Sequence, residues 1–263
     1  LTVLGITVAL LVTVLANKES NSAQNNNNKT SATNSRLQRP NKTITNGIIP
    51  IVKVSQIKGY SESDFFIGVT EVTTSQWQEV MRSKPSQVRH VSGRSDLHPI
   101  EGVSWEEAVK FCNQLSRTEG RRPCYDRNFE CNFNNNGYRL PTSNEWAMAC
   151  YGNIQTTYPW GNNWDNRYAV DPITKSSANW MKESRTRPVK TKEPNRLGIY
   201  DMIGNVSEWC NDPFSGRSQY RTYRGGDWSD WNKTSLKSTW KGGLDRLDSL
   251  PSIGFRVVTN SAK

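Results

Sequence analysis

The sequence predicts a single loop-rich domain that contains both helices and strands and follows an apolar N-terminal segment and a polar tether. The 263 residues include 10 Trp, 9 Tyr and 7 Phe at a mean hydropathy of -0.74, so a few large rings must fill the core between polar loops. Three segments in the first two-thirds of the chain carry helix-capping signals, and regular periodicity is nearly lost after residue 151. This length fits one domain, because core volume supports about 100 to 200 residues per domain.

Residues 1–16 form an uncharged apolar run that suits the core of a signal peptide and is short for a membrane-spanning helix. A non-cleaved membrane anchor is the alternative. In either case we expect the rest of the protein to be exported, to the cell surface, the periplasm or the medium. We expect it to touch a membrane only through this N-terminal segment.

Residues 17–47 are dominated by Asn, Ser, Thr, Lys and Gln, with almost no side chain to bury. Such a composition does not offset the entropy lost on ordering, so we expect a disordered tether. The folded domain is then expected over residues 48–260, because apolar runs begin at Ile48.

Two strands are predicted at the start of the domain. Residues 48–54 and 64–72 are apolar runs rich in Ile, Val and Phe, which are typical of strands. After residue 151, Gly, Pro, Asn and Trp persist, but neither the strand period nor the helix period is visible. We therefore expect the second part to be irregular, with its backbone polar groups satisfied by turns, side chains and ions.

Three helices are predicted after these strands. Residues 73–81 begin with hydroxyl residues that cap a helix and place apolar side chains at helical spacing. The segment 103–115 contains Ser104 as the N-cap, and Glu107 three residues later completes a capping box. Residues 141–150 repeat the hydroxyl-then-acidic pattern, which predicts a third, short helix.

The chain is strongly basic, with a formal charge of +10 and a pI near 9.4. Such a charge favours polyanionic partners in general. Lys and Arg are scattered through 82–94, 117–127, 182–196 and 217–246 instead of lying on one helix face, so we predict a solvated basic surface and no nucleic-acid partner. Anionic glycans, lipid headgroups and a negatively charged cell surface stay open.

Five cysteines occur in the chain. In an exported protein the short interval between Cys124 and Cys131 favours a local disulfide, and five reduced, mostly buried thiols are the alternative. No Cys-x-x-Cys is present, and His90 and His98 are not spaced with the cysteines as metal ligands are, so no zinc site is expected.

Seven short motifs run in one order through the predicted domain. Each motif is weak alone, but seven in sequence are specific. They resemble the formylglycine-generating (sulfatase-modifying factor) enzyme family over roughly residues 48–258. The motifs are Gly68–Thr73, His98–Trp105, Tyr138–Trp146, Pro159–Gly161, Gly198–Trp209, Arg224–Gly226 and Gly254–Arg256.

The resemblance implies an irregular α+β domain with the C-type-lectin fold, poor in regular elements. We assign structural roles to most motif side chains, since recurring motifs hold a fold together. Arg224 and Arg256 are expected in internal salt bridges or backbone hydrogen bonds, because a guanidinium has five donors. Arg139 and Glu145 are expected to pair with each other or to cap a helix. The expected core anchors are Trp105, Trp146, Trp160 and Trp209.

A structural calcium site is predicted in the run Tyr200–Trp209. This run places two carboxylates, on Asp201 and Glu208, seven residues apart with a Gly between them, and a turn there brings both around one hard cation. The resemblance implies that the ligands come from Asp201, from the carbonyls of Gly204 and Val206, and from Glu208. The alternative is a capped turn in which Glu208 is salt-bridged to an arginine.

The oxidative chemistry of the family is not expected here. The resemblance implies a reduced cysteine pair that binds Cu(I), and this requires soft thiolate ligands. At the two corresponding positions this chain has Ser235 and Trp240, and no cysteine follows Cys210. We therefore predict no copper and no enzymatic activity. The alternative is a formylglycine-generating-type enzyme or accessory that acts on a cysteine-bearing peptide.

Residues 227–249, between the last two motifs, are predicted to form a surface that binds an unidentified protein or glycan. The segment shows neither regular period, and the resemblance implies that it forms the rim of the substrate site. It contains tryptophan and arginine, which commonly anchor interfaces. The predicted contact residues are Asp227, Ser229, Asp230, Trp231, Asn232, Ser238, Trp240, Lys241, Leu244, Asp245, Arg246 and Leu247.

A second resemblance concerns the same segment. Variable proteins of diversity-generating retroelements use the lectin-type fold and carry a C-terminal variable region that ends shortly after a Gly-Phe-Arg-like close. Residues 227–249 lie shortly before the Gly-Phe-Arg sequence at Gly254–Arg256. We therefore consider them a candidate region for retroelement diversification. A purely structural envelope or secretion component is a third class that the sequence leaves open.

Overall fold

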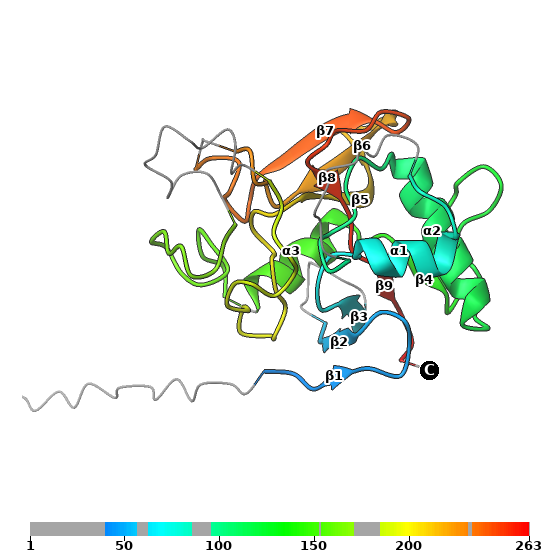
Figure 1. The fold of residues 1–263 in the computed structure, drawn as a ribbon, viewed down its shortest axis with the longest axis horizontal. Helices are drawn as coiled ribbons and strands as arrows, with labels where there is room; N and C mark the ends of the chain where they lie inside the picture. Colours follow the sequence, from blue (N-terminus) through cyan, green and yellow to red (C-terminus); the bar gives the residue numbers. More distant parts are fainter. Residues whose placement is uncertain are drawn as a thin grey trace, which may run out of the picture. The chain divides into compact units, whose positions relative to one another are not determined.

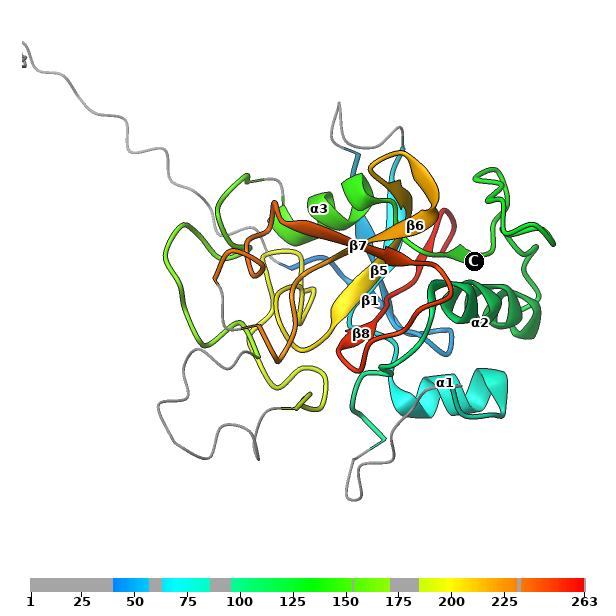
Figure 2. The same cartoon turned by 90° about the horizontal axis from the view of Figure 1, so that it is seen from above.

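Two β-sheets and three α-helices make up the described part of the chain (Figures 1 and 2). The computed structural model describes residues 40–56, 63–85, 96–152, 154–170, 185–230 and 233–262. The predicted signal peptide or anchor at 1–16 and most of the predicted tether therefore lie outside the described residues. No helix within the described ranges is long and apolar enough to cross a membrane.

The first sheet joins both ends of the domain. Its strands are β1 (Thr43–Ile44), β2 (Ile51–Val54), β3 (Phe65–Gly68), β4 (Tyr138–Arg139) and β9 (Val258–Thr259). They lie in the order β1-β2-β3-β9-β4, and every neighbouring pair is antiparallel. The last strand of the chain therefore lies between two early strands (Figure 1). The two strands predicted near residues 48 and 64 are confirmed as β2 and β3, both shorter than expected.

The predicted boundary of the tether at residue 47 is wrong, because the ordered chain already includes residues 40–47. Strand β1 pairs with β2 through Thr43 and Ile44, and the Asn41 side-chain amide donates to the carbonyl of Lys53 at 2.7 Å. A two-residue strand in a polar segment has no readable period. Only its pairing with β2 identifies it.

The second sheet lies in the part of the chain that was predicted to be irregular. Its strands are β5 (Ser207–Phe214), β6 (Arg217–Arg224), β7 (Lys241–Asp245) and β8 (Ile253–Gly254), in the order β7-β6-β5-β8. The expectation of no regular structure is wrong here for a physical reason. The first four residues of β5 are all buried, polar ones included, so the strand shows no alternation of polar and apolar residues.

The three predicted helices are confirmed as α1 (Thr74–Met81), α2 (Trp105–Thr118) and α3 (Ser143–Tyr151). Each begins after a hydroxyl N-cap and has a complete capping box, in which the N-cap side chain accepts from the N3 backbone and the N3 side chain accepts from the N-cap backbone. Two of the boxes, at Ser104 and Glu107 and at Thr142 and Glu145, follow the predicted hydroxyl-then-acidic pattern.

Large rings anchor the core, as predicted. Trp105, Trp146 and Trp209 are fully buried, and Trp160 is half-buried against the second of two core clusters. The indole of Trp105 donates to the carbonyl of Cys210, and that of Trp209 donates to the carbonyl of Val103, both at 2.9 Å. These reciprocal bonds join the start of α2 to β5, so the rings fix the second sheet on the helical part of the domain.

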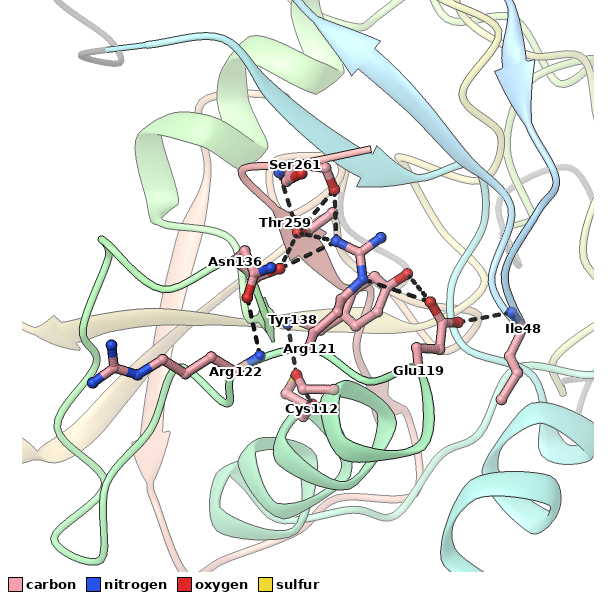
Figure 3. Close-up of polar contacts among 10 residues, drawn as sticks. Ile48, Cys112, Glu119, Arg121, Arg122, Asn136, Tyr138, Thr259 and Ser261 are labelled. Atoms are coloured by element: carbon pink, nitrogen blue, oxygen red, sulfur yellow. Dashed lines mark hydrogen bonds and ion pairs between the residues drawn. The ribbon is translucent and has the colours of Figure 1, made fainter. Parts of the chain in front are cut away.

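Where segments that form no sheet ladder meet, buried arginine side chains connect them by hydrogen bonds. Arg139 forms two hydrogen bonds of 2.6 Å to Glu145, which confirms the predicted pair. In a second network, one guanidinium nitrogen of Arg121 contacts the carbonyls of Asn136 and Ser261 and the hydroxyl of Thr259 (Figure 3). This network ties the chain that follows α2 to the C-terminal strand β9.

The same network continues to the start of the domain through Glu119. Its carboxylate accepts from the Tyr138 hydroxyl and from the backbone of Ile48, both at 2.9 Å (Figure 3). It also lies 3.6 Å from the Arg121 guanidinium, and both side chains are almost fully buried. Elements from the start, the middle and the end of the domain thus share one polar cluster.

All five cysteines have free thiols in the structure. The predicted disulfide between Cys124 and Cys131 is therefore not present, and the alternative of reduced, mostly buried thiols describes this state. The two residues still lie close, because the backbone N–H of Asn132 donates to the carbonyl of Cys124 at 2.8 Å. Burial raises the pKa of the Cys131 thiol to about 12, which keeps it protonated at neutral pH.

Candidate functional site

The predicted binding segment 227–249 consists of a loop, the edge strand β7 and the turn that leads toward β8. Figures 1 and 2 show the loop running beside the chain that follows α3. Two contacts confirm this proximity: the backbone N–H of Ser238 donates to the carbonyl of Thr157 at 2.9 Å, and the Lys233 ammonium lies 5.8 Å from the centroid of the Trp164 ring. The binding segment therefore shares its surface with residues 154–170.

Arg224 makes the predicted backbone hydrogen bond and thereby holds the loop. Its guanidinium donates to the Ser143 hydroxyl at 2.8 Å and to the Ser238 carbonyl at 2.6 Å, and it stacks 5.0 Å from the Trp146 ring centroid. Both ends of the loop are thereby fixed to the N-terminus of α3. A loop anchored at its base presents its outer side chains on a rigid support.

Some predicted contact residues face inward and brace the loop. Ser238 is fully buried in this structure, so its side chain does not reach the surface on which a ligand would bind. Asp227 is also buried, and one of its carboxylate oxygens accepts from the backbone and the hydroxyl of Ser229. Asp230 in turn accepts from the backbone N–H of Asp227 at 2.9 Å. Residue type alone did not distinguish these inward positions from outward ones.

The other predicted residues that the structure describes reach the surface to different degrees. Leu247 exposes 66% of its surface, which is unusual for a large apolar side chain on an otherwise polar turn. Trp231 and Asn232 lie outside the described residues. Ser229, Lys241 and Leu247 are exposed, and Asp230, Trp240, Leu244, Asp245 and Arg246 are half-buried.

Strand β7 carries two glycines because aromatic rings press against its backbone. A Cβ atom on Gly243 would lie 2.1 Å from the Phe214 ring, and one on Gly242 would lie 2.4 Å from the Tyr223 ring. Tyr223 also contacts Trp240 edge-on at 5.7 Å. The half-buried pair of Trp240 and Tyr223 thus forms an aromatic edge on the sheet, and the sequence prediction did not include Tyr223.

A second aromatic group lies beside the loop and was missed as a binding feature. The rings of Tyr158, Trp160 and Tyr168 form a stack, with centroid distances of 5.3 Å and 5.1 Å, and Trp164 packs edge-on against two of them. Trp160, Trp164 and Tyr168 are half-buried. Four aromatic residues within eleven positions were the signal in the sequence.

In the predicted calcium loop, the carboxylate of Glu208 is part of a buried ion pair with Arg256. Both side chains of this pair, Glu208 and Arg256, have no exposed surface. Arg256 donates two hydrogen bonds to the Glu208 carboxylate, at 2.6 and 2.7 Å, and Trp146 donates a third at 2.7 Å. Glu208 therefore has the arginine partner that was the alternative, and in this state its carboxylate does not fit the role of a calcium ligand.

Two neighbouring carboxylates, on Asp201 and Glu71, differ from Glu208 because each has at least one buried oxygen with no hydrogen-bond partner among the described residues. Asp201 accepts a hydrogen bond from the backbone of Lys190 on one oxygen, and its other oxygen is buried without a partner. Glu71 is fully buried, and within the described part of the chain neither of its carboxylate oxygens has a hydrogen-bond partner. Burial raises the pKa of Glu71 well above its ordinary value, and the nearby Asp201 adds to this shift. Burial also raises the pKa of Asp201 to about 6.

Charge balance explains what this cluster requires. When all groups are ionised, the buried carboxylates of Glu71, Asp201 and Glu208 share the one buried guanidinium of Arg256, and the half-buried Lys192 also acts on Asp201, so the described buried groups carry more negative than positive charge. Buried charges of this kind take up protons or bind a cation. The free oxygens of Glu71 and Asp201 fit a hard divalent cation. Within the described residues, no three His, Cys, Asp or Glu side chains come together closely enough to hold a metal ion, so main-chain carbonyls would have to complete such a set.

The backbone of the loop turns sharply at Gly204 and Asn205, which both have positive φ. Gly204 has a φ of 80°, and a Cβ atom there would lie 2.3 Å from the Val170 carbonyl, so only glycine fits. Asn205, also at positive φ, exchanges hydrogen bonds with the backbone of Arg187 through its side chain. These contacts hold Gly204 and Val206, whose carbonyls were predicted as ligands, in a fully buried turn. Calcium binding here stays a prediction.

This fold and these motifs define a class of protein: the chain belongs to the sulfatase-modifying factor enzyme 1-like domain family, which matches residues 43–261. The predicted formylglycine-generating-enzyme type of C-type-lectin fold is thereby confirmed. Among proteins of known sequence, the chain is similar to the chaperone protein LppX of Paenibacillus barcinonensis, with 33% identity over 237 residues, which cover 76% of this chain and 82% of that protein.

Two further relatives represent different uses of the fold. The formylglycine-generating enzyme of Thermomonospora curvata is 29% identical over 154 residues, which cover 54% of this chain and 38% of that enzyme. The solved structure of Treponema denticola variable protein 1 superposes with a TM-score of 0.68 and 25% identity, over 84% of this chain and 99% of that one. The chain is therefore similar both to an enzyme and to a variable protein.

Proposed function

We propose that this protein is an exported, non-catalytic binding protein that holds a protein or glycan ligand on the surface formed by residues 227–249. The observation that carries the proposal is the composition of this surface. It has an exposed leucine, a half-buried tryptophan and charged side chains on an anchored loop, and no thiol. Such a surface is suited to recognition.

The absence of thiols supports a non-catalytic role. Ser235 and Trp240 occupy the positions at which the family resemblance implies the copper-binding cysteines, and no cysteine follows Cys210. Ser235 is buried, and Trp240 packs on Tyr223. Neither side chain offers the soft sulfur donor that Cu(I) requires.

The relatives support the same reading at the level of the family. One is named a chaperone protein and another a variable protein, and both cover most of this chain. We extend the proposal to retroelement diversification of residues 227–249. Sequencing of the DNA around the coding region tests this extension: we expect a near-copy of the terminal coding stretch that differs only at adenines, and its absence together with the absence of a reverse transcriptase would refute it.

The binding surface is tested by a change at its most exposed apolar residue. Leu247→Ser should abolish binding to ligands that the wild-type protein retains in glycan-array and extracellular-protein panels, because an exposed leucine offers apolar area to a partner. Leu97→Ser is the matched control, since Leu97 also exposes more than half of its surface, 56%, outside residues 227–249. Equal binding by both variants would contradict the proposed surface.

The competing function is a formylglycine-generating-type enzyme or accessory, which the similarity to the Thermomonospora curvata enzyme favours. Oxygen uptake by the purified protein, with copper and a cysteine-bearing peptide, separates the two functions. We expect no copper-dependent uptake. Turnover of the peptide cysteine to an aldehyde would overturn the non-catalytic proposal.

Calcium is proposed as a structural ion at the cluster of Glu71 and Asp201. Bound to the native state alone, it would add about 2.7 kcal/mol of stability at 100 times its Kd. We expect calcium to raise the Tm of the wild-type protein, and Asp201→Ala to remove this rise. Ser218→Ala, at an exposed position on β6, is the control and should keep it. No rise in Tm at millimolar calcium would exclude the site.

A further inference from the structure

A pocket of about 560 Å³ lies between the end of α1, the outer face of α2 and the chain from Tyr125 to Phe129. None of its lining residues belongs to the segment 227–249 or to the predicted calcium loop. Its volume falls within the range of small-molecule sites, roughly 300–1,000 Å³.

The rim of this pocket is strongly basic. Arg82, Lys110, Arg117 and Arg127 line it, and Asp126 is the only carboxylate among the described residues that line it. Lys110 lies 3.7 Å from Glu106. The side chains of the three arginines have no hydrogen bond or ion pair with any other residue in the described part of the chain, and Arg82 and Arg117 are hydrogen-bonded only through their backbones. Three guanidiniums are therefore free to bind a ligand.

The single carboxylate does not neutralise these cations. One oxygen of Asp126 accepts from the backbone N–H groups of Asn128 and Glu130, at 2.8 and 2.9 Å. These bonds hold the loop in its turn. Among the described lining residues, four cations against one carboxylate give a formal charge of +3.

Two non-glycine residues in the left-handed region place their side chains on the pocket. Arg82 ends α1 with a φ of 52°, and Phe129 has a φ of 64°. Glycine is the preferred residue in this conformation, particularly at a helix C-terminus. The chain keeps an arginine and a phenylalanine at these positions, and both contribute to the pocket wall.

The floor of the pocket is rigid and partly apolar. Phe129 and Tyr125 both pack edge-on against the buried Trp105, with centroid distances of 6.3 and 6.1 Å. The side chain of Asn113 bonds both the N–H and the carbonyl of Tyr125. The floor is thus held in place before a ligand binds, which lowers the entropy cost of binding.

We propose that this pocket binds a small organic anion that carries at least two phosphate, sulfate or carboxylate groups. The planar fork of arginine matches the geometry of such oxyanions. Three unpaired arginines around one opening favour more than one anionic group. The Phe129 ring and the side chain of Met81 offer an apolar surface to the body of the ligand.

Isothermal titration calorimetry on the full chain tests this site with three probes: inorganic pyrophosphate, a sulfated disaccharide and the same disaccharide without sulfate. We expect saturable binding of the sulfated disaccharide and none of the unsulfated one. Binding of pyrophosphate as well would show that the anionic groups suffice, and its absence would show that the ligand body is also recognised. Both outcomes support the site.

Arg82→Gly is the decisive variant, because glycine suits the conformation at this position and the Tm should be kept or raised. Loss of a charge-assisted contact should weaken binding of the sulfated disaccharide about tenfold or more. Arg117→Ala should have a similar effect. Lys190→Gly is the matched control, since Lys190 is exposed, has a φ of 64° and carries the same charge.

Two results would overturn the proposal. The first is equal weakening by Arg82→Gly and Lys190→Gly, which would attribute binding to the overall charge of +10. The second is an absence of saturable binding by both anionic probes in 50 mM salt or less, roughly, where electrostatic screening is weak.

Discussion

Replacement of Arg256 by leucine tests the central buried ion pair. In the wild-type protein the guanidinium makes four hydrogen bonds: two to the carboxylate of Glu208, one to the carbonyl of Gly68 at 3.0 Å and one to the carbonyl of Tyr200 at 3.1 Å. Arg256→Leu removes all four and leaves Glu208 as a buried carboxylate whose one remaining donor in these contacts is Trp146.

The expected loss follows from this geometry. Removing one partner of a buried pair costs about 3–5 kcal/mol, because the other charge stays buried and uncompensated. Here the loss belongs to the upper part of that range, since Glu71 and Asp201 lie in the same cluster and also interact with Arg256. For a domain of this size the change corresponds to a fall in Tm of about 10 °C.

Urea unfolding followed by tryptophan fluorescence measures the free energy of unfolding directly. The double variant Glu208→Leu with Arg256→Leu should recover much of the loss, because no unpaired charge then stays buried at this pair. Arg196→Leu, at an exposed position, is the control for the loss of one surface charge. A loss below about 1 kcal/mol for Arg256→Leu would refute the reasoning, since that is the range of solvent-exposed pairs.

The remaining predictions concern other buried polar groups. Glu71→Gln should stabilise the protein at neutral pH in the presence of a chelator. The pKa of Glu71 is raised in the folded state, so the folded form binds more protons than the unfolded form, and wild-type stability falls as pH rises above the ordinary value of 4.5. Thermal unfolding between pH 4 and 8, roughly, should show a smaller decline for the variant, and an unchanged profile would contradict the pKa shift. Arg121→Ala should cost about 2 kcal/mol in urea unfolding, because three acceptors lose a charged donor. Arg122→Ala, at the adjacent exposed position, should leave stability nearly unchanged, and an equal loss in both variants would exclude the network as the cause.

Local signals predicted the helices well. Each capping box depends on residues three positions apart, so the pattern at Ser104 and Glu107 was readable without any knowledge of the tertiary structure. Arg139 and Glu145, which lie in one short motif only six residues apart, were expected to pair or to cap a helix, and they pair. The family resemblance then supplied the fold class, because seven ordered motifs specify one chain path.

The second sheet and the direction of side chains in the binding segment were not predictable in this way. Strand β7 contains two adjacent glycines, Gly242 and Gly243. They allow it to pair with β6 while the rings of Phe214 and Tyr223, which are distant from β7 in sequence, press against its backbone. Ser238 faces inward because Arg224 binds its carbonyl from the other end of the loop. A residue list alone did not separate such bracing positions from exposed ones.

The sequence by itself determined where the helices begin and which family motifs the chain carries. It also showed that no cysteine follows Cys210. Only the tertiary structure decided that Glu71 lies with Asp201 and Glu208, that Arg256 neutralises one of these three carboxylates, and that arginines from the end of α1, from α2 and from the loop after α2 line one pocket. The physical reason is the range of the interactions. Caps act over a few residues, whereas burial, charge balance and pocket shape depend on segments that meet only after the chain has folded.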